Sequence, residues 1–262
     1  MEQKIGNKNS RIVAIITMCF IFAMISFVTN MGAPFGNIWG FKYTWASMMG
    51  NFMNFAAYLF MGIPAGKMLE SKGYKKTALI ALAFGIVGLL VQYLSSLFGD
   101  DIVVFTLKSG AVCLNLIIYL LGAFICGFCV CMLNTVVNPM LNLLGGGGNR
   151  GNQLIQIGGT LNSLTGTLTP LLAGVLVGTV TAQTSMSDVA PLLFIGMAVF
   201  IAAFFIISYV EIPEPNAKKD NATYERSPWA FRHCVLGVIG IFFYVGVEIG
   251  IPAQLNFYIS NM

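Results

Sequence analysis

Amide side chains are concentrated inside the strongly apolar stretches of this sequence. In residues 111–144, three asparagines recur every four residues, which places them on one face of a helix: Asn134, Asn138 and Asn142. Residues 153–180 carry a polar stripe spaced 3, 4, 3 and 4 residues apart: Gln153, Gln156, Thr160, Ser163 and Thr167. Each carboxamide offers hydrogen-bond donors and acceptors, so it can pair with a hydroxyl group in either sense. The pattern favours binding of a neutral, polyhydroxylated ligand.

The earlier apolar stretches extend this set of amides. The candidate substrate-binding residues are Asn30, Asn54, Asn134, Asn138, Gln156 and Asn162. Hydrogen bonding between helices is the plainer alternative for each of them. A sugar or a nucleoside would suit such a site. A strongly charged ligand would require charges that the first six apolar stretches lack.

These residues must be positioned by membrane-spanning helices. Apolar residues make up 57% of the chain and charged residues 9%, whereas a soluble domain carries about 25% charged residues. A spanning helix needs about 20 apolar residues. We expect spans at 12–36, 43–66, 77–97, 111–144, 153–180, 189–210 and 230–258. The sequence therefore predicts an all-α polytopic membrane protein in contact with the lipid bilayer.

The distribution of Lys and Arg predicts the orientation. With the N-terminus in the cytoplasm, twelve basic residues fall on the cytoplasmic side: Lys4, Lys8, Arg11, Lys67, Lys72, Lys75, Lys76, Arg150, Lys218, Lys219, Arg226 and Arg232. The opposite side has only Lys42 and Lys108. This bias follows the positive-inside rule and predicts a plasma membrane location, in a bacterium the inner membrane. The net charge of +4 then reflects topology, and no nucleic-acid partner is expected.

Other chemistries find little support. Cys126, Cys129 and Cys131 lie together in one apolar stretch, and we interpret them as small buried packing residues. The glycine run at 145–148 lacks the Lys and Ser/Thr of a phosphate-binding loop and is interpreted as a turn between spans. His233 is the only histidine. We expect no enzyme activity, no metal and no cofactor.

One loop carries a more specific pattern. Two glycines stand seven residues apart with an acid between them and a basic pair just after: Gly66, Glu70, Gly73, Lys75 and Lys76. This resembles the loop between helices 2 and 3 of the major facilitator superfamily, although the usual acid there is Asp. The resemblance implies a six-helix bundle and a gating role for the loop, in which Glu70 engages nearby basic groups and the other half of the transporter.

The domain organisation follows from that resemblance. We expect an N-terminal six-helix bundle over 1–210, a polar cytoplasmic linker over 211–229, and a seventh helix over 230–262. Superfamily transporters place six more helices after such a linker, so we expect the chain to be a fragment whose missing partner is a C-terminal bundle.

A closer resemblance is to the fucose:proton symporter family of sugar transporters. Four segments carry it in order: Phe27 to Pro34, Asn134 to Gly145, Thr160 to Ser163, and Tyr244 to Gly250. This chain departs from the family at three places, with Ala33 for an Asp, Asn134 for a Glu, and Gly159 for a Gln. The two missing carboxylates are those that the family is thought to use for proton coupling and sugar contact, so its standard proton mechanism does not transfer.

Glu248 is then the only acid expected inside a span. We expect it to carry a coupling proton or to help bind a cation such as Na⁺, with a structural carboxylate as the alternative. The resemblance implies cation-coupled symport of a neutral monosaccharide by alternating access. A drug:proton antiporter of the same superfamily and a non-transporting membrane sensor are the alternatives.

Overall fold

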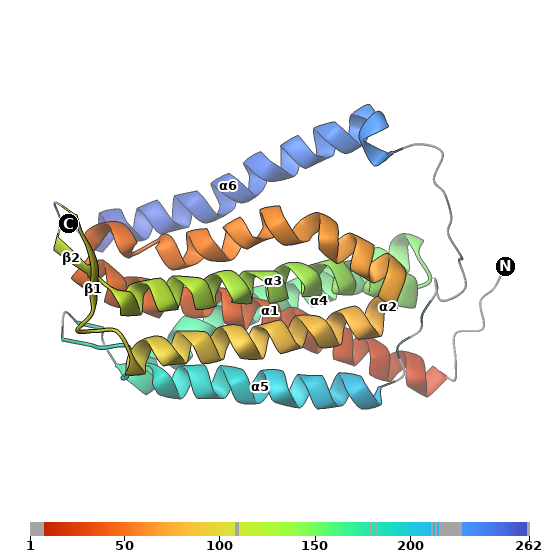
Figure 1. Ribbon diagram of the computed structural model, residues 1–262. Helices are drawn as coiled ribbons and strands as arrows, with labels where there is room; N and C mark the ends of the chain where they lie inside the picture. The colour runs from red at the N-terminus through yellow and green to blue at the C-terminus, as the bar shows by residue number, and fades with distance from the viewer. Residues whose placement is uncertain are drawn as a thin grey trace. The chain divides into compact units, whose positions relative to one another are not determined.

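A computed structural model describes residues 8–107, 110–178, 180–181, 183–210, 212, 214 and 227–260 (Figure 1). Five of the basic residues used to predict the orientation lie outside the described residues: Lys4, Lys108, Lys218, Lys219 and Arg226. Most of the expected linker over 211–229 lies outside them as well.

Helices dominate the described residues. The α-helices are α1 (Lys8–Lys42), α2 (Met49–Leu97), α3 (Leu114–Leu144), α4 (Gly148–Val177), α5 (Ala190–Tyr209) and α6 (Arg232–Ser260). Two short 3₁₀ helices, η1 (Thr44–Ala46) and η2 (Pro228–Ala230), and one antiparallel pair, β1 (Val103–Leu107) and β2 (Gly110–Cys113), complete the order.

The helices have the length and composition of membrane spans. In the part of the chain that the structure describes, five helices from α1 to α5 are long and apolar enough to cross a bilayer. The chain is therefore an all-α polytopic membrane protein, as predicted. It divides into two compact units, Met1–Ala217 and Lys218–Met262. The first holds α1 to α5, and the second holds η2 and α6.

Two expected spans, 43–66 and 77–97, are joined in the structure. Helix α2 runs for 49 residues through the expected loop, and only Gly73 interrupts its helical backbone, with φ 81° and ψ 175°. A residue with a side chain rarely adopts this conformation, whereas glycine adopts it readily. The loop is thus a single joint at Gly73 that turns α2 back on itself.

Small residues allow the second half of α2 to pack closely on α3. A Cβ added at Gly88 would lie 2.6 Å from Sγ of Cys126, and one added at Gly122 would lie 2.7 Å from Cγ of Gln92. Membrane helices associate through such close approaches because lipid provides no hydrophobic drive between them. Cys126 and Cys129 are buried in this interface, which agrees with their interpretation as packing residues.

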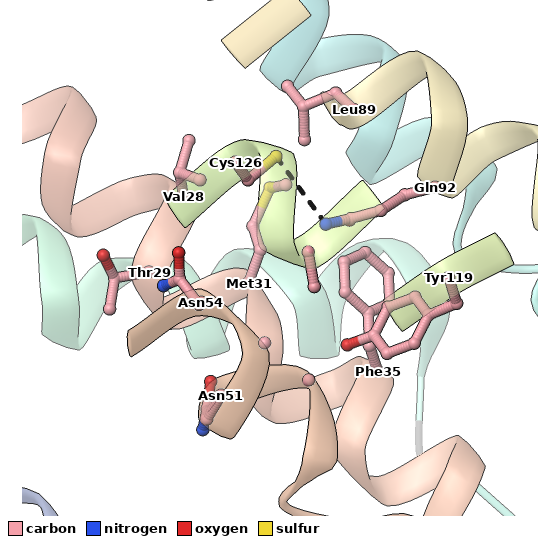
Figure 2. Close-up of a pocket in the computed structure, with 13 residues that line it drawn as sticks. Val28, Thr29, Met31, Phe35, Asn51, Asn54, Leu89, Gln92, Tyr119 and Cys126 are labelled. Atoms are coloured by element: carbon pink, nitrogen blue, oxygen red, sulfur yellow. Dashed lines mark hydrogen bonds between the residues drawn. The ribbon is translucent and has the colours of Figure 1, made fainter. Parts of the chain in front are cut away.

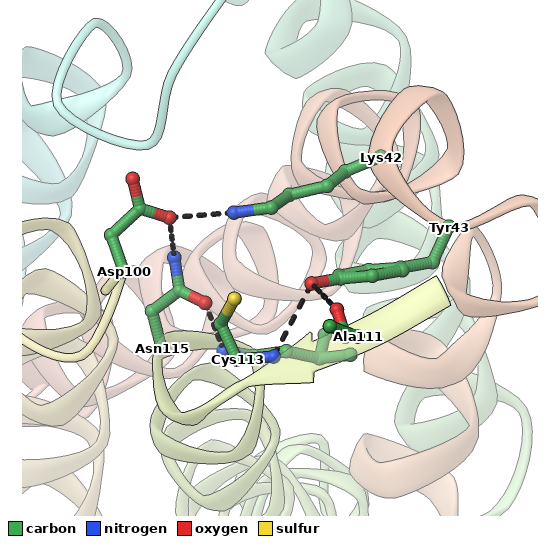
Figure 3. A network of polar contacts seen from close by, with 7 residues as sticks. Lys42, Tyr43, Asp100, Ala111, Cys113 and Asn115 are labelled. Carbon is green, nitrogen blue, oxygen red and sulfur yellow. Dashed lines mark hydrogen bonds and ion pairs between the residues drawn. The ribbon is translucent and has the colours of Figure 1, made fainter. Parts of the chain in front are cut away.

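One end of the α1–α5 bundle is closed by a β-hairpin that the sequence analysis missed. The expected span 111–144 was wrong at its start, because Gly110–Cys113 form β2 and the helix begins at Leu114. Tyr43 Oη donates to the carbonyl of Ala111 (2.9 Å) and accepts from the amide of Cys113 (3.3 Å). Beside it, Asp100 accepts from Lys42 Nζ (2.5 Å) and Asn115 Nδ2 (2.9 Å) (Figure 3).

The opposite end of the bundle holds the turn between α3 and α4. Gly146, Gly147 and Gly148 all have positive φ, at 81°, 74° and 56°, which explains why glycines are needed there. Arg11 Nε donates to the carbonyl of Leu144 at 2.7 Å and ties the start of α1 to the end of α3. The Gly73 joint and the end of α5 lie at this same end (Figure 1).

Candidate functional site

The polar stripe of α4 lies on the surface of the α1–α5 bundle. All five of its side chains are exposed: Gln153, Gln156, Thr160, Ser163 and Thr167. The helical spacing predicted that they share a face, and their common exposure agrees with this. A polar face of a membrane span is costly against lipid, so such a face is turned to a partner helix or to water.

Asn30 and Asn162 lie where α1 meets α4. Asn162 Nδ2 donates to the carbonyl of Phe22 on α1 at 2.9 Å. Asn30 Nδ2 donates to the carbonyl (2.8 Å) and the hydroxyl (3.1 Å) of Ser26 one turn earlier. Gly166 leaves room for it, since a Cβ there would lie 3.1 Å from Asn30 Nδ2. Both asparagines are half-buried beside the exposed stripe of α4.

Asn134 and Asn138 lie one turn apart on α3, and Asn134 contacts the first half of α2. Asn134 Nδ2 donates to Tyr58 Oη at 3.0 Å, and Asn138 Nδ2 donates to the carbonyl of Asn134 at 3.1 Å. Both side chains are half-buried. The structure therefore divides four of the six candidate residues into one pair between α1 and α4 and another between α2 and α3.

These four asparagines share one pattern of hydrogen bonding. Each amide nitrogen donates within the bundle, while no bond to a side-chain Oδ1 of the four is found among the described residues. Each carbonyl oxygen can therefore accept a hydrogen bond from a ligand. A hydroxyl-rich ligand supplies such donors, so these free acceptors fit the predicted class of ligand.

Asn54 lies in a different environment from the other candidates. It is 6% exposed and lines a cavity of about 20 Å³ between α1, α2 and α3 (Figure 2). Small-molecule pockets measure roughly 300–1,000 Å³, so this cavity is too small for a sugar ring. Gln156, by contrast, is exposed on α4. Asn54 is therefore not brought to the same surface as the α4 stripe.

The predicted gating loop is held by an acid that the sequence analysis did not select. Glu214, beyond the end of α5, accepts hydrogen bonds from the backbone amides of Tyr74 and Lys75, both at 2.8 Å. Lys75 Nζ donates in return to the carbonyls of Ser208 (2.8 Å) and Val210 (3.0 Å) at the end of α5. The carboxylate thus caps the second half of α2 directly after the break at Gly73.

The other residues of that loop make fewer contacts. Gly66, Glu70 and Lys76 are exposed, and no hydrogen bond or ion pair of Glu70 is found within the described ranges. Its engagement with basic groups stays a prediction. Glu248 lies on α6 in the second unit, with an exposed side chain, and its coupling role also stays a prediction.

Three residues of this region were missed by sequence reasoning. Tyr58 lies one turn after Asn54, and its aromatic ring gave no sign that its hydroxyl would meet Asn134. Gln92 is a lone amide in an apolar stretch, which was a usable signal, because such a group requires a partner. Glu214 contacts residues 139 and 140 positions earlier, and no local pattern reports such a pairing.

Comparison with known proteins gives distant relatives of one kind. No protein-family model matches the chain. A protein of Brucella abortus biovar 1 named "Glucose/galactose transporter" is 25% identical over 261 residues, which cover 95% of this chain and 58% of the relative. A Helicobacter pylori protein named "Putative glucose/galactose transporter" is 27% identical over 270 residues, which cover 95% of this chain and 60% of the relative. The chain therefore spans less than two thirds of the length of these relatives.

Proposed function

We propose that this chain belongs to a secondary transporter of the major facilitator kind that moves a neutral monosaccharide by alternating access. Support comes from the similarity, over 95% of the chain, to proteins named glucose/galactose transporter. The structural observation that carries the proposal is the exposed polar stripe of α4. An all-α membrane protein with such a face requires water or another bundle beside it.

Alternating access gives that face a role. Transporters of this type bind substrate near the bilayer midplane between two helix bundles that rock against each other. The stripe of α4 would then line the substrate path on one side. A second bundle would close the path on the other side. Such a path requires no charged group, because a neutral sugar is bound by hydrogen bonds alone.

Sugar recognition would use the asparagines at the two helix contacts. Asn30 and Asn162 would accept hydrogen bonds from sugar hydroxyls at the α1–α4 contact, and Asn134 and Asn138 would do so at the α2–α3 contact. Their amide nitrogens are already engaged within the bundle, which holds each carbonyl oxygen in a fixed direction. Preorganised acceptors reduce the entropy lost on binding.

The transport proposal is tested by uptake in bacterial cells that lack their own hexose transporters. Cells that express the full-length protein are expected to accumulate labelled glucose or galactose, and Gln156→Leu should reduce the rate. Thr169→Val is the matched control, because Thr169 lies on the same helix but is buried, with its hydroxyl bonded to the carbonyl of Thr165. Equal uptake with and without the protein would refute the proposal.

The finer assignment to the fucose:proton symporter family is tested by competition. L-fucose should displace bound galactose if the chain shares that family's preference. Displacement by glucose alone would favour the preference that the names of the relatives suggest. Transport of lipophilic cations without sugar uptake would instead favour the antiporter alternative.

Coupling to a cation is proposed to use Glu248. Glu248→Gln should abolish accumulation driven by a proton or Na⁺ gradient while sparing exchange of sugar across the membrane, since exchange needs no net movement of the cation. Accumulation that is unchanged in Glu248→Gln would rule out this role.

The orientation and the gate belong to the same proposal. The N-terminus is proposed to lie in the cytoplasm of a bacterial inner membrane, which is supported by the basic residues near Gly73 and Arg150 at one end of the bundle. Glu70→Ala should shift the balance of inward- and outward-open forms without weakening sugar binding. Loss of affinity with unchanged conformer populations would contradict the gating role.

A further inference from the structure

A small cavity with several polar side chains in its lining lies where α1, α3 and both halves of α2 meet. Its lining includes Thr29 from α1, Asn54 from the first half of α2, Gln92 from the second half, and Tyr119 and Cys126 from α3 (Figure 2). The volume is about 20 Å³. One water molecule needs roughly 10–15 Å³ measured in this way, so the cavity can hold water.

Two buried oxygens of the lining lack hydrogen-bond partners. Within the described part of the chain, Asn54 Oδ1 and Gln92 Oε1 have no partner, and each side chain is 6% exposed. The nitrogen of Gln92 reaches Sγ of Cys126 at 3.7 Å, a weak contact. An unpaired buried acceptor destabilises the fold. Buried acceptors of this kind are normally paired with protein or with ordered water.

We propose that this cavity is an internal hydration site in which bound water donates hydrogen bonds to Asn54 Oδ1 and to Gln92 Oε1. The missing groups are donors, and water supplies two of them per molecule. The hydroxyl of Thr29 already donates to the carbonyl of Ile25 at 2.9 Å, so it can serve a water only as an acceptor. The inference does not depend on the transport proposal.

The chemistry of the lining residues favours water over a cation as the occupant of the cavity. The thirteen lining residues include no carboxylate, and an uncompensated charge inside a membrane span is costly. Water requires no counter-charge. Water would also supply the hydrogen-bond donors that Asn54 Oδ1 and Gln92 Oε1, one on each half of α2, lack within the described residues.

The site is tested by X-ray hydroxyl-radical footprinting of the full chain in nanodiscs prepared in ¹⁸O-labelled water. Radiolysis of a bound water produces the radical beside the side chains that contact it. Met31 and Cys126 line the cavity and are 1% and 2% exposed. We expect both to gain labelled oxygen several-fold faster than Met132 and Cys129, which are fully buried outside the cavity.

A substitution sharpens the test. Gln92→Leu removes one acceptor and should lower oxidation of Cys126 to the rate of Cys129. Ser95→Ala is the control, because Ser95 is also buried on α2 and its hydroxyl is bonded to the carbonyl of Gln92 at 2.7 Å, outside the cavity. It should leave the pattern unchanged.

Two results would overturn the inference. Equal oxidation of Met31 and Met132 in the unsubstituted chain would mean that the cavity is dry, and this comparison stands even if Gln92→Leu does not fold. Oxidation of Met31 and Cys126 that falls when Na⁺ replaces choline in the buffer would mean that a cation occupies the site instead of water.

Discussion

The contact of Glu214 with the joint in α2 gives the sharpest quantitative prediction. Glu214→Ala removes both hydrogen bonds to the amides of Tyr74 and Lys75. Loss of a helix N-cap costs about 0.5–2 kcal/mol, and a hydrogen bond to a charged group contributes about 1.5–3 kcal/mol. Because Glu214 is half-buried, water replaces part of this interaction.

We therefore expect a local loss of about 1.4–2.8 kcal/mol, which corresponds to roughly 10–100-fold. Hydrogen exchange measured by mass spectrometry in nanodiscs reports this directly. In Glu214→Ala, the amides of Tyr74 and Lys75 should exchange faster by that factor. Glu214→Gln keeps one carbonyl acceptor and should give an intermediate value.

Lys72→Ala is the control, since Lys72 is an exposed residue of the same loop with no contact to these two amides. It should leave their exchange unchanged. Exchange that is unaffected by Glu214→Ala, or affected equally by Lys72→Ala, would refute the assignment of Glu214 as the cap.

Three further predictions concern the rest of the bundle. The hydrogen bond from Lys42 lowers the pKa of Asp100, so its contribution to stability is present above about pH 4 and is lost as the pH falls through the lowered value. Thermal unfolding should show a small acid-dependent loss that Asp100→Asn removes, small because Asp100 is 73% exposed. Tyr58→Phe removes the acceptor for Asn134 and should weaken sugar binding about 2–10-fold in equilibrium binding, from a hydrogen bond of about 0.5–1.5 kcal/mol. Gly88→Ala should destabilise the chain by about 1–3 kcal/mol in unfolding assays because its Cβ would overlap with α3, whereas Gly62→Ala, with nothing within 4 Å, should not.

Hydropathy and helical spacing predicted much of this architecture because both are local properties. Apolar stretches of about 20 residues predicted the spans, and the 3-and-4 spacing from Gln153 to Thr167 predicted a shared face that the structure confirms as exposed. The β-hairpin was missed because β2 (Gly110–Cys113) joins directly onto the apolar start of α3, so that its residues from Ala111 were assigned to a longer span.

Local sequence patterns could not predict how deeply a side chain is buried or which residues distant in the sequence are in contact. Spacing shows which residues share a face, but it does not show how deeply a neighbouring helix buries them. For this reason Asn54 was grouped with the other asparagines although it is buried beside a small cavity. The cap on the Gly73 joint depends on Glu214, 140 residues after Tyr74, and proximity over that separation follows only from the packing of α5 on α2.

The same separation sets the order in which the protein can be assembled. Chains are synthesised at about 5–20 residues per second, so Glu214 emerges from the ribosome roughly 7–28 s after Tyr74 at that rate. Ser208 at the end of α5, whose carbonyl accepts a hydrogen bond from Lys75 Nζ, is synthesised after a similar delay. For most of this interval both halves of α2 have been synthesised, yet the turn at Gly73 has neither its carboxylate cap nor the carbonyl groups of α5 to which Lys75 donates. The joint is therefore among the last parts of the bundle to be locked during biosynthesis.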